Sequence, residues 1–231
     1  MPRPLFDLPV AAVPILGEDA LYPVRRVFCV ARNYASHARE MGGDPTREPP
    51  FYFTKPADAL VPGGGDIAYP PATTNLHHEV ELVVALAAPL FQASAEEAAR
   101  AVFGHAVGLD MTRRDLQFAA RDKGRPWDLG KSFEQSAPIS ALVRADAPLT
   151  HAAIALTVNG EARQHGDISD MTWPVAEVLA HLSQYYHLDR GDVVFTGTPE
   201  GVGPVIPGDV LVGSIAGIGE LRVTIVPMIN R

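Results

Sequence analysis

The chain has 231 residues, a net charge of −8 and 47% hydrophobic residues, a balance that suits an ordinary globular core. This acidity, without any Lys/Arg cluster, excludes the electrostatic footprint of a nucleic-acid-binding protein. No apolar run approaches the roughly 20 residues that span a bilayer, the N-terminus lacks the apolar stretch of a signal peptide, and Cys29 is the only cysteine. We therefore expect a cytoplasmic protein that binds neither nucleic acid nor membrane, with a buried Cys29 thiol.

Residues 1–24 are rich in proline and show little periodicity, so we expect an extended arm there and a single domain over residues 25–231. In the rest of the chain glycine and proline are plentiful, apolar runs are short and helical stretches are few. These features predict an α+β fold that is mostly β, with a hairpin turn at Asn159-Gly160. The predicted strands cover residues 27–30, 51–55, 77–86, 106–112, 154–158, 192–196, 210–215 and 221–226.

Three helices are predicted between these strands. The first covers residues 32–41. The second opens with a capping box at residues 94–97 and ends at Gly104. The third is amphipathic, is capped by Thr172-Trp173-Pro174 and ends near residues 189–191.

The strand predicted over residues 77–86 carries the first candidate site. Its residues alternate between an apolar face and a face that carries two carboxylates, Glu79 and Glu81. Residues two apart on a strand lie roughly 6.5–7 Å apart, so one hard divalent cation could bind both carboxylates and relieve their repulsion. The alternative is a solvated strand face on an exposed sheet edge, which is common for an isolated Glu-x-Glu.

Four further residues could take part in chemistry. Asp110 lies near the end of the strand predicted over 106–112 and would complete a set of three carboxylates that suits Mg²⁺ or Mn²⁺ with open coordination positions. Lys131 lies in an apolar stretch, where a lone ammonium is costly. His37 and Glu40, three apart on a helix, could form a base and its orienting carboxylate. The structural alternatives are a helix cap for Asp110, a surface cation for Lys131 and a solvated helix face for His37 and Glu40.

Other catalytic motifs are absent from the sequence. It has no phosphate loop ending in Gly-Lys-Ser/Thr, no dinucleotide fingerprint, no His-Glu-x-x-His, no cysteine pair for zinc and no Gly-x-Ser-x-Gly. Residues 197–201, Gly-Thr-Pro-Glu-Gly, lack the lysine of a phosphate loop. Their backbone amides and the threonine hydroxyl could still hold a carboxylate.

A series of motifs extends across most of residues 25–212. They are Arg32-Asn33-Tyr34-Ala35-Ser36-His37, Phe53-Thr54-Lys55-Pro56, His77-His78-Glu79-Val80-Glu81-Leu82, Gly108-Leu109-Asp110-Met111-Thr112, Arg113-Arg114-Asp115-Leu116-Gln117, Lys131-Ser132-Phe133, Val158-Asn159-Gly160 and Phe195-Thr196-Gly197-Thr198-Pro199-Glu200-Gly201. In this order they resemble the fumarylacetoacetate hydrolase superfamily, most of all its acylpyruvate-cleaving branch. One departure is Ala31, where many members carry glycine.

The resemblance implies a mixed β-roll with few helices, in a protein that is usually a homodimer. It implies Mg²⁺ or Mn²⁺ at Glu79, Glu81 and Asp110, and it places His37 and Glu40 on a lid over the substrate. The residues that it implies in contact with a diketo acid are Arg114, Gln117, Lys131 and Thr198, with Lys55 as an additional candidate.

The implied reaction is hydrolysis of a carbon–carbon bond in a 2,4-diketo acid, with fumarylpyruvate giving fumarate and pyruvate in gentisate degradation. His37, oriented by Glu40, would activate water, while Lys131 and the metal would stabilise the oxyanion and a pyruvate enolate. The alternatives on the same metal site are an acylpyruvase that decarboxylates oxaloacetate and an isomerase or hydratase of 2-oxo-alkenoates. A metal-holding scaffold that binds an acidic metabolite without turnover is the non-enzyme alternative. The acyl group would depend on the cavity shape, including residues 42–50.

Overall fold

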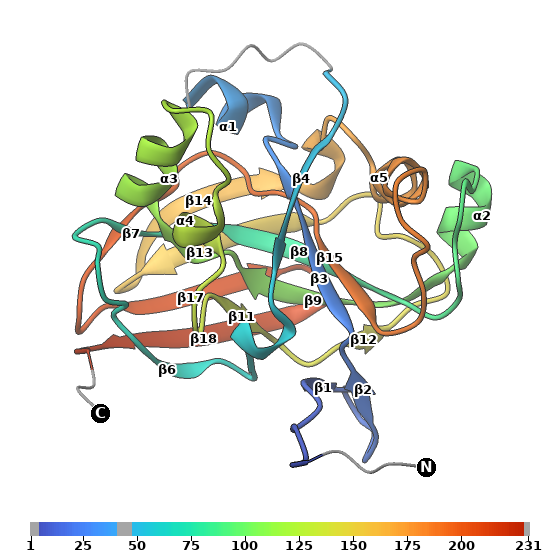
Figure 1. Ribbon diagram of the computed structural model, residues 1–231, viewed down its shortest axis with the longest axis horizontal. Coiled ribbons are helices and arrows are strands. Elements are labelled where there is room, and N and C mark those ends of the chain that lie inside the picture. The colour runs from blue at the N-terminus through green and yellow to red at the C-terminus, as the bar shows by residue number, and fades with distance from the viewer. Residues whose placement is uncertain (1–4, 41–47, 229–231) are drawn as a thin grey trace.

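Two β-sheets packed against each other form the body of the protein, in the computed structural model that describes residues 5–40 and 48–228 (Figure 1). The larger sheet has eight strands in the order β4-β3-β15-β8-β9-β11-β5, with β12 beside β9. Its strands are β3 (Arg26–Ala31), β4 (Phe51–Lys55), β5 (Leu60–Pro62), β8 (Val80–Leu86), β9 (Val102–Leu109), β11 (Ala137–Ile139), β12 (Val143–Arg144) and β15 (Asp192–Phe195).

The second sheet has five strands in the order β14-β13-β17-β18-β6. These strands are β6 (Gly65–Ala68), β13 (Ala153–Val158), β14 (Glu161–Asp167), β17 (Val210–Ile215) and β18 (Gly219–Val226). Asn159 and Gly160 connect β13 to β14 with φ angles of 54° and 83°, so the predicted hairpin turn is confirmed. The mostly β fold with few helices is also confirmed.

The two sheets enclose the larger hydrophobic core, and a second, smaller core covers the other face of the eight-stranded sheet. The central strand β8 therefore has all seven residues buried. The predicted alternation holds, because Leu82 faces the larger core and Val83 the smaller one. The alternative of a solvated strand face on an exposed sheet edge is wrong, because β8 is a central strand and side chains cover both of its faces.

Five α-helices lie outside the sheets within the described residues. They are α1 (Ala35–Glu40), α2 (Ala95–Arg100), α3 (Arg114–Arg121), α4 (Asp128–Lys131) and α5 (Val175–Leu182). In Figure 1, α1, α3 and α4 gather on one side of the molecule and α2 and α5 on another. Two short 3₁₀ turns, η1 (Ala57–Ala59) and η2 (Ile168–Asp170), complete the helical segments.

The helix boundaries differ from prediction where tertiary contacts intervene. The capping box of Ser94 and Glu97 is confirmed, but α2 ends at Arg100 and Gly104 lies inside β9. That strand pairs with β8, and a side chain at Gly104 would collide with the Val143 backbone. The third helix begins after Pro174 without a side-chain cap and stops at Leu182, short of the predicted end. The predicted end of the first helix, at residue 41, lies outside the described residues.

Two small sheets complete the architecture. One joins β10 (Thr112–Arg113), β7 (Leu76–His78) and β16 (Gly203–Val205), and the other joins β1 (Ala12–Pro14) to β2 (Leu21–Pro23) within the predicted arm. Val13 and Tyr22 of that hairpin are buried in the smaller core. The division into an arm (1–24) and a domain (25–231) remains a prediction. No helix in the described part of the chain is long and apolar enough to cross a membrane.

Candidate metal centre and catalytic site

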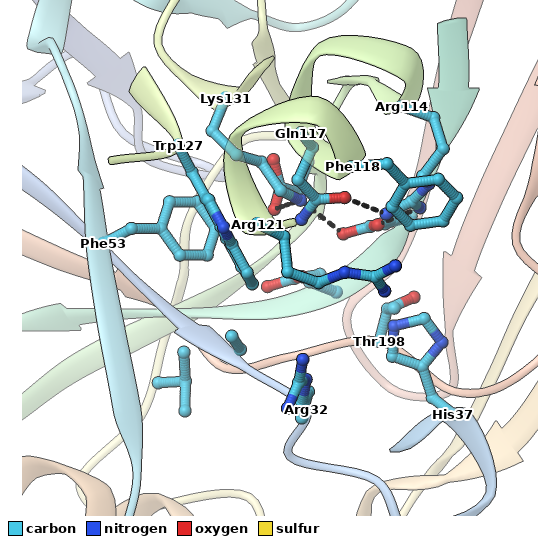
Figure 2. A pocket seen from close by; sticks show the side chains of 15 residues that line it. Arg32, His37, Phe53, Arg114, Gln117, Phe118, Arg121, Trp127, Lys131 and Thr198 are labelled. Carbon is cyan, nitrogen blue, oxygen red and sulfur yellow. Dashed lines mark hydrogen bonds and ion pairs between the residues drawn. The ribbon is translucent and has the colours of Figure 1, made fainter. Parts of the chain in front are cut away.

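One cavity collects most of the residues that the sequence singles out (Figure 2). Its lining comes from the end of β3, α1, β4, the start of β8, the end of β9, α3, α4 and the loop after β15. The lining residues are Val30, Ala31, Arg32, His37, Phe53, Glu79, Glu81, Asp110, Arg114, Gln117, Phe118, Arg121, Trp127, Lys131 and Thr198.

Three buried carboxylates converge at the base of this cavity. Glu79 lies between β7 and β8, Glu81 is the second residue of β8, and Asp110 directly follows β9. Because β8 and β9 are antiparallel neighbours, the start of one meets the end of the other. Each residue offers an oxygen within 4.8 Å of the other two.

Buried cationic side chains hold two of these carboxylates. The ammonium of Lys131 lies 2.8 Å from Glu79 Oε2 and 2.6 Å from Asp110 Oδ2, and it also donates to Thr112 Oγ1 at 2.7 Å. Arg114 donates to the second oxygen of Glu79. The short helices α3 and α4 therefore place their cations over the acidic cluster.

The carboxylates differ in how well their charge is compensated. Burial opposes the ionisation of Glu79, but Lys131 and Arg114 hold its pKa well below the usual value. Burial, Asp110 and Glu79 together raise the pKa of Glu81 well above the usual value. Glu81 accepts a hydrogen bond from the Gly197 amide at 2.9 Å, which compensates its charge only in part.

Lys55 lies behind the acidic cluster and does not line the cavity. Its ammonium donates to the backbone carbonyls of Met111 and Lys131 and lies 2.9 Å from Asp110 Oδ1. Only 2% of the residue is exposed. This position orients Asp110 and gives no support to the expected contact between Lys55 and a substrate.

His37 lies on the cavity wall, with Glu40 behind it on the same helix. His37 Nδ1 and Glu40 Oε2 are 3.1 Å apart, and both oxygens of Glu40 accept from the Gly201 amide at 3.2 Å. The hydrogen bond with His37 is the main cause of a lowered pKa for Glu40. An ionised Glu40 favours the tautomer of His37 with its proton on Nδ1, which leaves Nε2 as an acceptor.

Thr198 is held in place by a buried residue that the sequence did not single out. Gln164 of β14 donates to Thr198 Oγ1 and to the Pro199 carbonyl, each at 2.8 Å, and accepts from the Val80 amide at 3.0 Å. The Thr198 hydroxyl donates to the Val80 carbonyl at 2.8 Å. Nothing in the sequence around Gln164 signals this role, because its partners lie far away along the chain.

The sequence also missed a polar and aromatic rim around the cavity. Arg32 and Phe53 were noted only as members of longer motifs, without a role of their own. Phe118, Arg121 and Trp127 carried no signal. Figure 2 shows Phe53 and Trp127 on one side of the cavity and Phe118 on the other, with Arg121 extending between them.

The donor set fits a hard divalent cation. All three candidate ligands are carboxylates, the ligand type that Mg²⁺ and Mn²⁺ favour. Asp110 Oδ1 is buried and receives no well-directed hydrogen bond, although Lys55 is close to it. An underbonded oxygen beside Glu81, with its raised pKa, indicates a place where added positive charge would be stabilising.

Comparisons with known proteins place the whole chain among its relatives. Residues 26–226 match the family model for the fumarylacetoacetate (FAA) hydrolase C-terminal domain. A fumarylpyruvate hydrolase from Ralstonia is 48% identical over 185 residues, which cover 80% of this chain and 96% of that protein. An oxaloacetate tautomerase of Escherichia coli, YcgM, is 42% identical over 194 residues, or 82% of this chain and 88% of the relative.

A solved structure extends the similarity to the whole fold. The crystal structure of a fumarylpyruvate hydrolase from Pseudomonas aeruginosa, in complex with Mn²⁺ and pyruvate, superposes with a TM-score of 0.95 at 51% identity. The match covers 97% of this chain and 100% of that one. Fold and site thus define a β-rich protein with a carboxylate metal centre. The chain belongs to the fumarylacetoacetate hydrolase family, so the family and the fold expected from the motifs are confirmed.

Proposed function

We propose that the protein is a metal-dependent hydrolase that cleaves the carbon–carbon bond of a 2,4-diketo acid, with fumarylpyruvate as the substrate and fumarate and pyruvate as the products. The observation that carries this proposal is one cavity that joins three buried carboxylates to a His–Glu pair. The 48% and 51% identical fumarylpyruvate hydrolases support the choice of substrate.

Glu79, Glu81 and Asp110 would hold the divalent cation, Mg²⁺ or Mn²⁺. When bound, such an ion supplies Lewis-acid stabilisation of negative charge on substrate oxygens. Mn²⁺ is supported by the Pseudomonas structure, which contains that ion.

In the proposed reaction, His37 Nε2 takes a proton from the attacking water. Glu40 holds the other ring nitrogen and stabilises the imidazolium that forms, and the Gly201 amide fixes Glu40. The water oxygen adds to the distal carbonyl carbon, and the bond between that carbon and the pyruvyl methylene then breaks. Its electron pair leaves with the pyruvyl group as an enolate, which takes up a proton to give pyruvate. A base of this kind typically contributes about 10²–10⁴-fold to the rate.

Lys131, Arg114, Gln117 and Thr198 are the proposed partners of the diketo acid. All three donors of the Lys131 ammonium already have acceptors in the structure. Its action on a substrate oxyanion therefore requires one of these bonds to be released. Arg114 donates to Gln117 Oε1 at 2.5 Å, so this pair would present its remaining donors to the substrate carboxylate as one unit.

The test is a spectrophotometric assay of purified protein with Mg²⁺ or Mn²⁺. We expect rapid loss of the diketo-enol absorbance of fumarylpyruvate, abolished by EDTA and restored by added metal, with slower turnover of acetylpyruvate and oxaloacetate. No loss of fumarylpyruvate under any metal condition would overturn the proposal.

A second candidate function is enolisation of oxaloacetate, favoured by the 42% identical oxaloacetate tautomerase. Decarboxylation of oxaloacetate and isomerisation of 2-oxo-alkenoates would use the same cation site. None of these reactions requires an activated water. Glu40→Gln should therefore lower hydrolysis of fumarylpyruvate far more than tautomerisation or decarboxylation. Equal losses would instead favour a role for His37 and Glu40 in enolisation.

The proposal also places the enzyme in gentisate degradation, as a cytoplasmic homodimer. Light scattering coupled to size exclusion tests the dimer. Growth of a deletion strain of the source organism on gentisate tests the pathway, and only a strain that fails to grow and accumulates fumarylpyruvate would support it.

A further inference from the structure

Two arginines on the cavity rim lack the buried acidic partners that the other cations have. Lys131 and Arg114 are buried against the carboxylates, whereas Arg32 and Arg121 are exposed. Both line the cavity and come from different elements, the β3–α1 turn and the end of α3. Figure 2 shows both side chains extending into the same open space.

Arg32 is held in an unfavourable backbone conformation at this position. Its φ is +57°, in the left-handed region that residues other than glycine rarely adopt. The next residue fixes the turn, because Asn33 bonds to the backbone of Trp173 and Thr196 at 2.8–2.9 Å. Within the described residues the Arg32 guanidinium has no hydrogen-bond or ion-pair partner. The turn at Arg32 thus holds a guanidinium without a partner among the described residues at the cavity wall. An anionic ligand would supply that partner.

Arg121 has only a weak partner of its own. Its Nε lies 3.2 Å from Asp122 Oδ1, in a pair whose side chains are 36% and 65% exposed, and such surface pairs contribute little. The guanidinium packs over the Phe118 ring at 4.5 Å. This contact supports the planar group while its N–H donors stay available to a ligand.

The space between the catalytic groups and these arginines has aromatic walls. Phe53 and Trp127, with ring centroids 6.0 Å apart, form one wall and Phe118 lies opposite. Flat, conjugated groups pack well between such rings. A flat acyl chain that ends in a negative charge would therefore match both the walls and the rim.

We propose that Arg32 and Arg121 form the subsite for a second carboxylate, at the far end of the acyl group, and so select acylpyruvates that are dicarboxylic acids. This inference rests on the proposed function, since it assigns the acyl end of the substrate in that same cavity. It goes beyond the reaction itself, because neither arginine is needed to break the carbon–carbon bond.

The test compares fumarylpyruvate with crotonoylpyruvate, its analogue with a methyl group in place of the terminal carboxylate. The measured quantity is the ratio of kcat/KM for the two substrates. In the Arg32→Gln and Arg121→Gln variants we expect this ratio to fall ~10- to 100-fold, the loss of one charge-assisted hydrogen bond. Arg121→Lys should restore part of the preference, because it keeps the charge but not the forked geometry.

Lys123→Gln is the matched control, because Lys123 is exposed two residues beyond Arg121 and does not line the cavity. A general effect of net charge would change the ratio equally in Lys123→Gln. Inhibition of the wild type by fumarate, compared with crotonate, gives a second readout, and it should weaken in Arg121→Gln.

The outcomes separate the two proposals. If the wild-type protein cleaves neither substrate, the proposed function fails. If it cleaves fumarylpyruvate but the ratio is unchanged in both arginine variants, or changes as much in Lys123→Gln, the carboxylate subsite is wrong while the hydrolase proposal stands.

Discussion

At the scale of single residues, two buried ammonium groups account for the ordering of the acidic cluster. Lys131 bridges Glu79 and Asp110, and Lys55 lies against the far oxygen of Asp110. Within the described part of the chain, Glu81 has no cationic partner and accepts only a backbone amide. Glu81 therefore depends most on an added cation.

This difference predicts the effect of Glu81→Ala on metal binding. We expect the purified variant to lose bound Mn²⁺ after dialysis, because two carboxylates remain and both are already engaged by lysine. Elemental analysis measures the metal content, and circular dichroism checks the fold. Glu96→Ala, which removes an exposed carboxylate from α2, should retain wild-type metal content. Full metal content in Glu81→Ala would show that the ligand set is wrong.

The catalytic role of His37 should be independent of metal binding. We expect His37→Ala to lower kcat by about 10²–10⁴-fold, the usual contribution of a positioned general base, with bound metal unchanged. Steady-state kinetics and elemental analysis on the same preparation test both parts. His151→Ala, at an exposed position, is the control. Equal loss of metal from His37→Ala would mean that His37 acts as a ligand.

At the scale of elements, the pairing of β8 with β9 positions the carboxylates. Glu81 of β8 lies opposite Gly108 of β9 in the register. A side-chain carbon at Gly108 would lie 2.5 Å from Phe195 Cε1 and Val83 Cγ2. The side chains of Phe195 in β15 and Val83 in β8 thus fill the space above Gly108, so that only glycine fits there.

We therefore expect Gly108→Ala to destabilise the protein by about 1–3 kcal/mol, as overpacking of a core does. Urea denaturation measures the free energy of unfolding. Gly203→Ala is the matched control, because the added carbon would meet only His78 at 3.6 Å and should leave stability nearly unchanged. A Gly108→Ala variant as stable as the wild type would show that the Phe195 and Val83 side chains can move aside at little cost.

At the scale of the whole molecule, coverage of both faces of the eight-stranded sheet buries titratable groups outside the cavity. His105 of β9 is 2% exposed and accepts the Leu149 amide at 3.1 Å. Burial lowers its pKa from 6.5 to about 4. The unfolded chain therefore binds a proton at a higher pH than the folded protein does.

The sign of the resulting pH dependence follows from this order of pKa values. Above pH 6.5 His105 is neutral in both states and does not change the stability, but as the pH falls toward 4 the free energy of unfolding drops by on the order of 3 kcal/mol. In His105→Gln, which can accept the same bond without titrating, the decline in unfolding free energy over this range should be smaller. Urea denaturation across the pH series measures it, and parallel curves for the two proteins would contradict the assignment.

Much of the secondary structure and of the metal site could be predicted from the sequence, because these features depend on short-range rules. The Ser94 capping box, the Asn159-Gly160 hairpin and the two faces of β8 each follow from residues a few positions apart. The acidic cluster followed from strand alternation plus one carboxylate, Asp110, at the end of a predicted strand.

Only the tertiary structure decided which residues surround that cluster and how far each helix extends. Lys55 was a candidate for substrate contact, yet the pairing of β3 with β4 places it behind Asp110. Gln164 donates a hydrogen bond to Thr198, which is 34 residues away in the sequence. Arg32 and Arg121 line the same cavity although they belong to separate elements. Local sequence determines which conformation a segment prefers, since that depends on neighbouring sterics and hydrogen bonds. Contacts between distant segments depend on how whole sheets pack, and no short stretch of sequence records that arrangement.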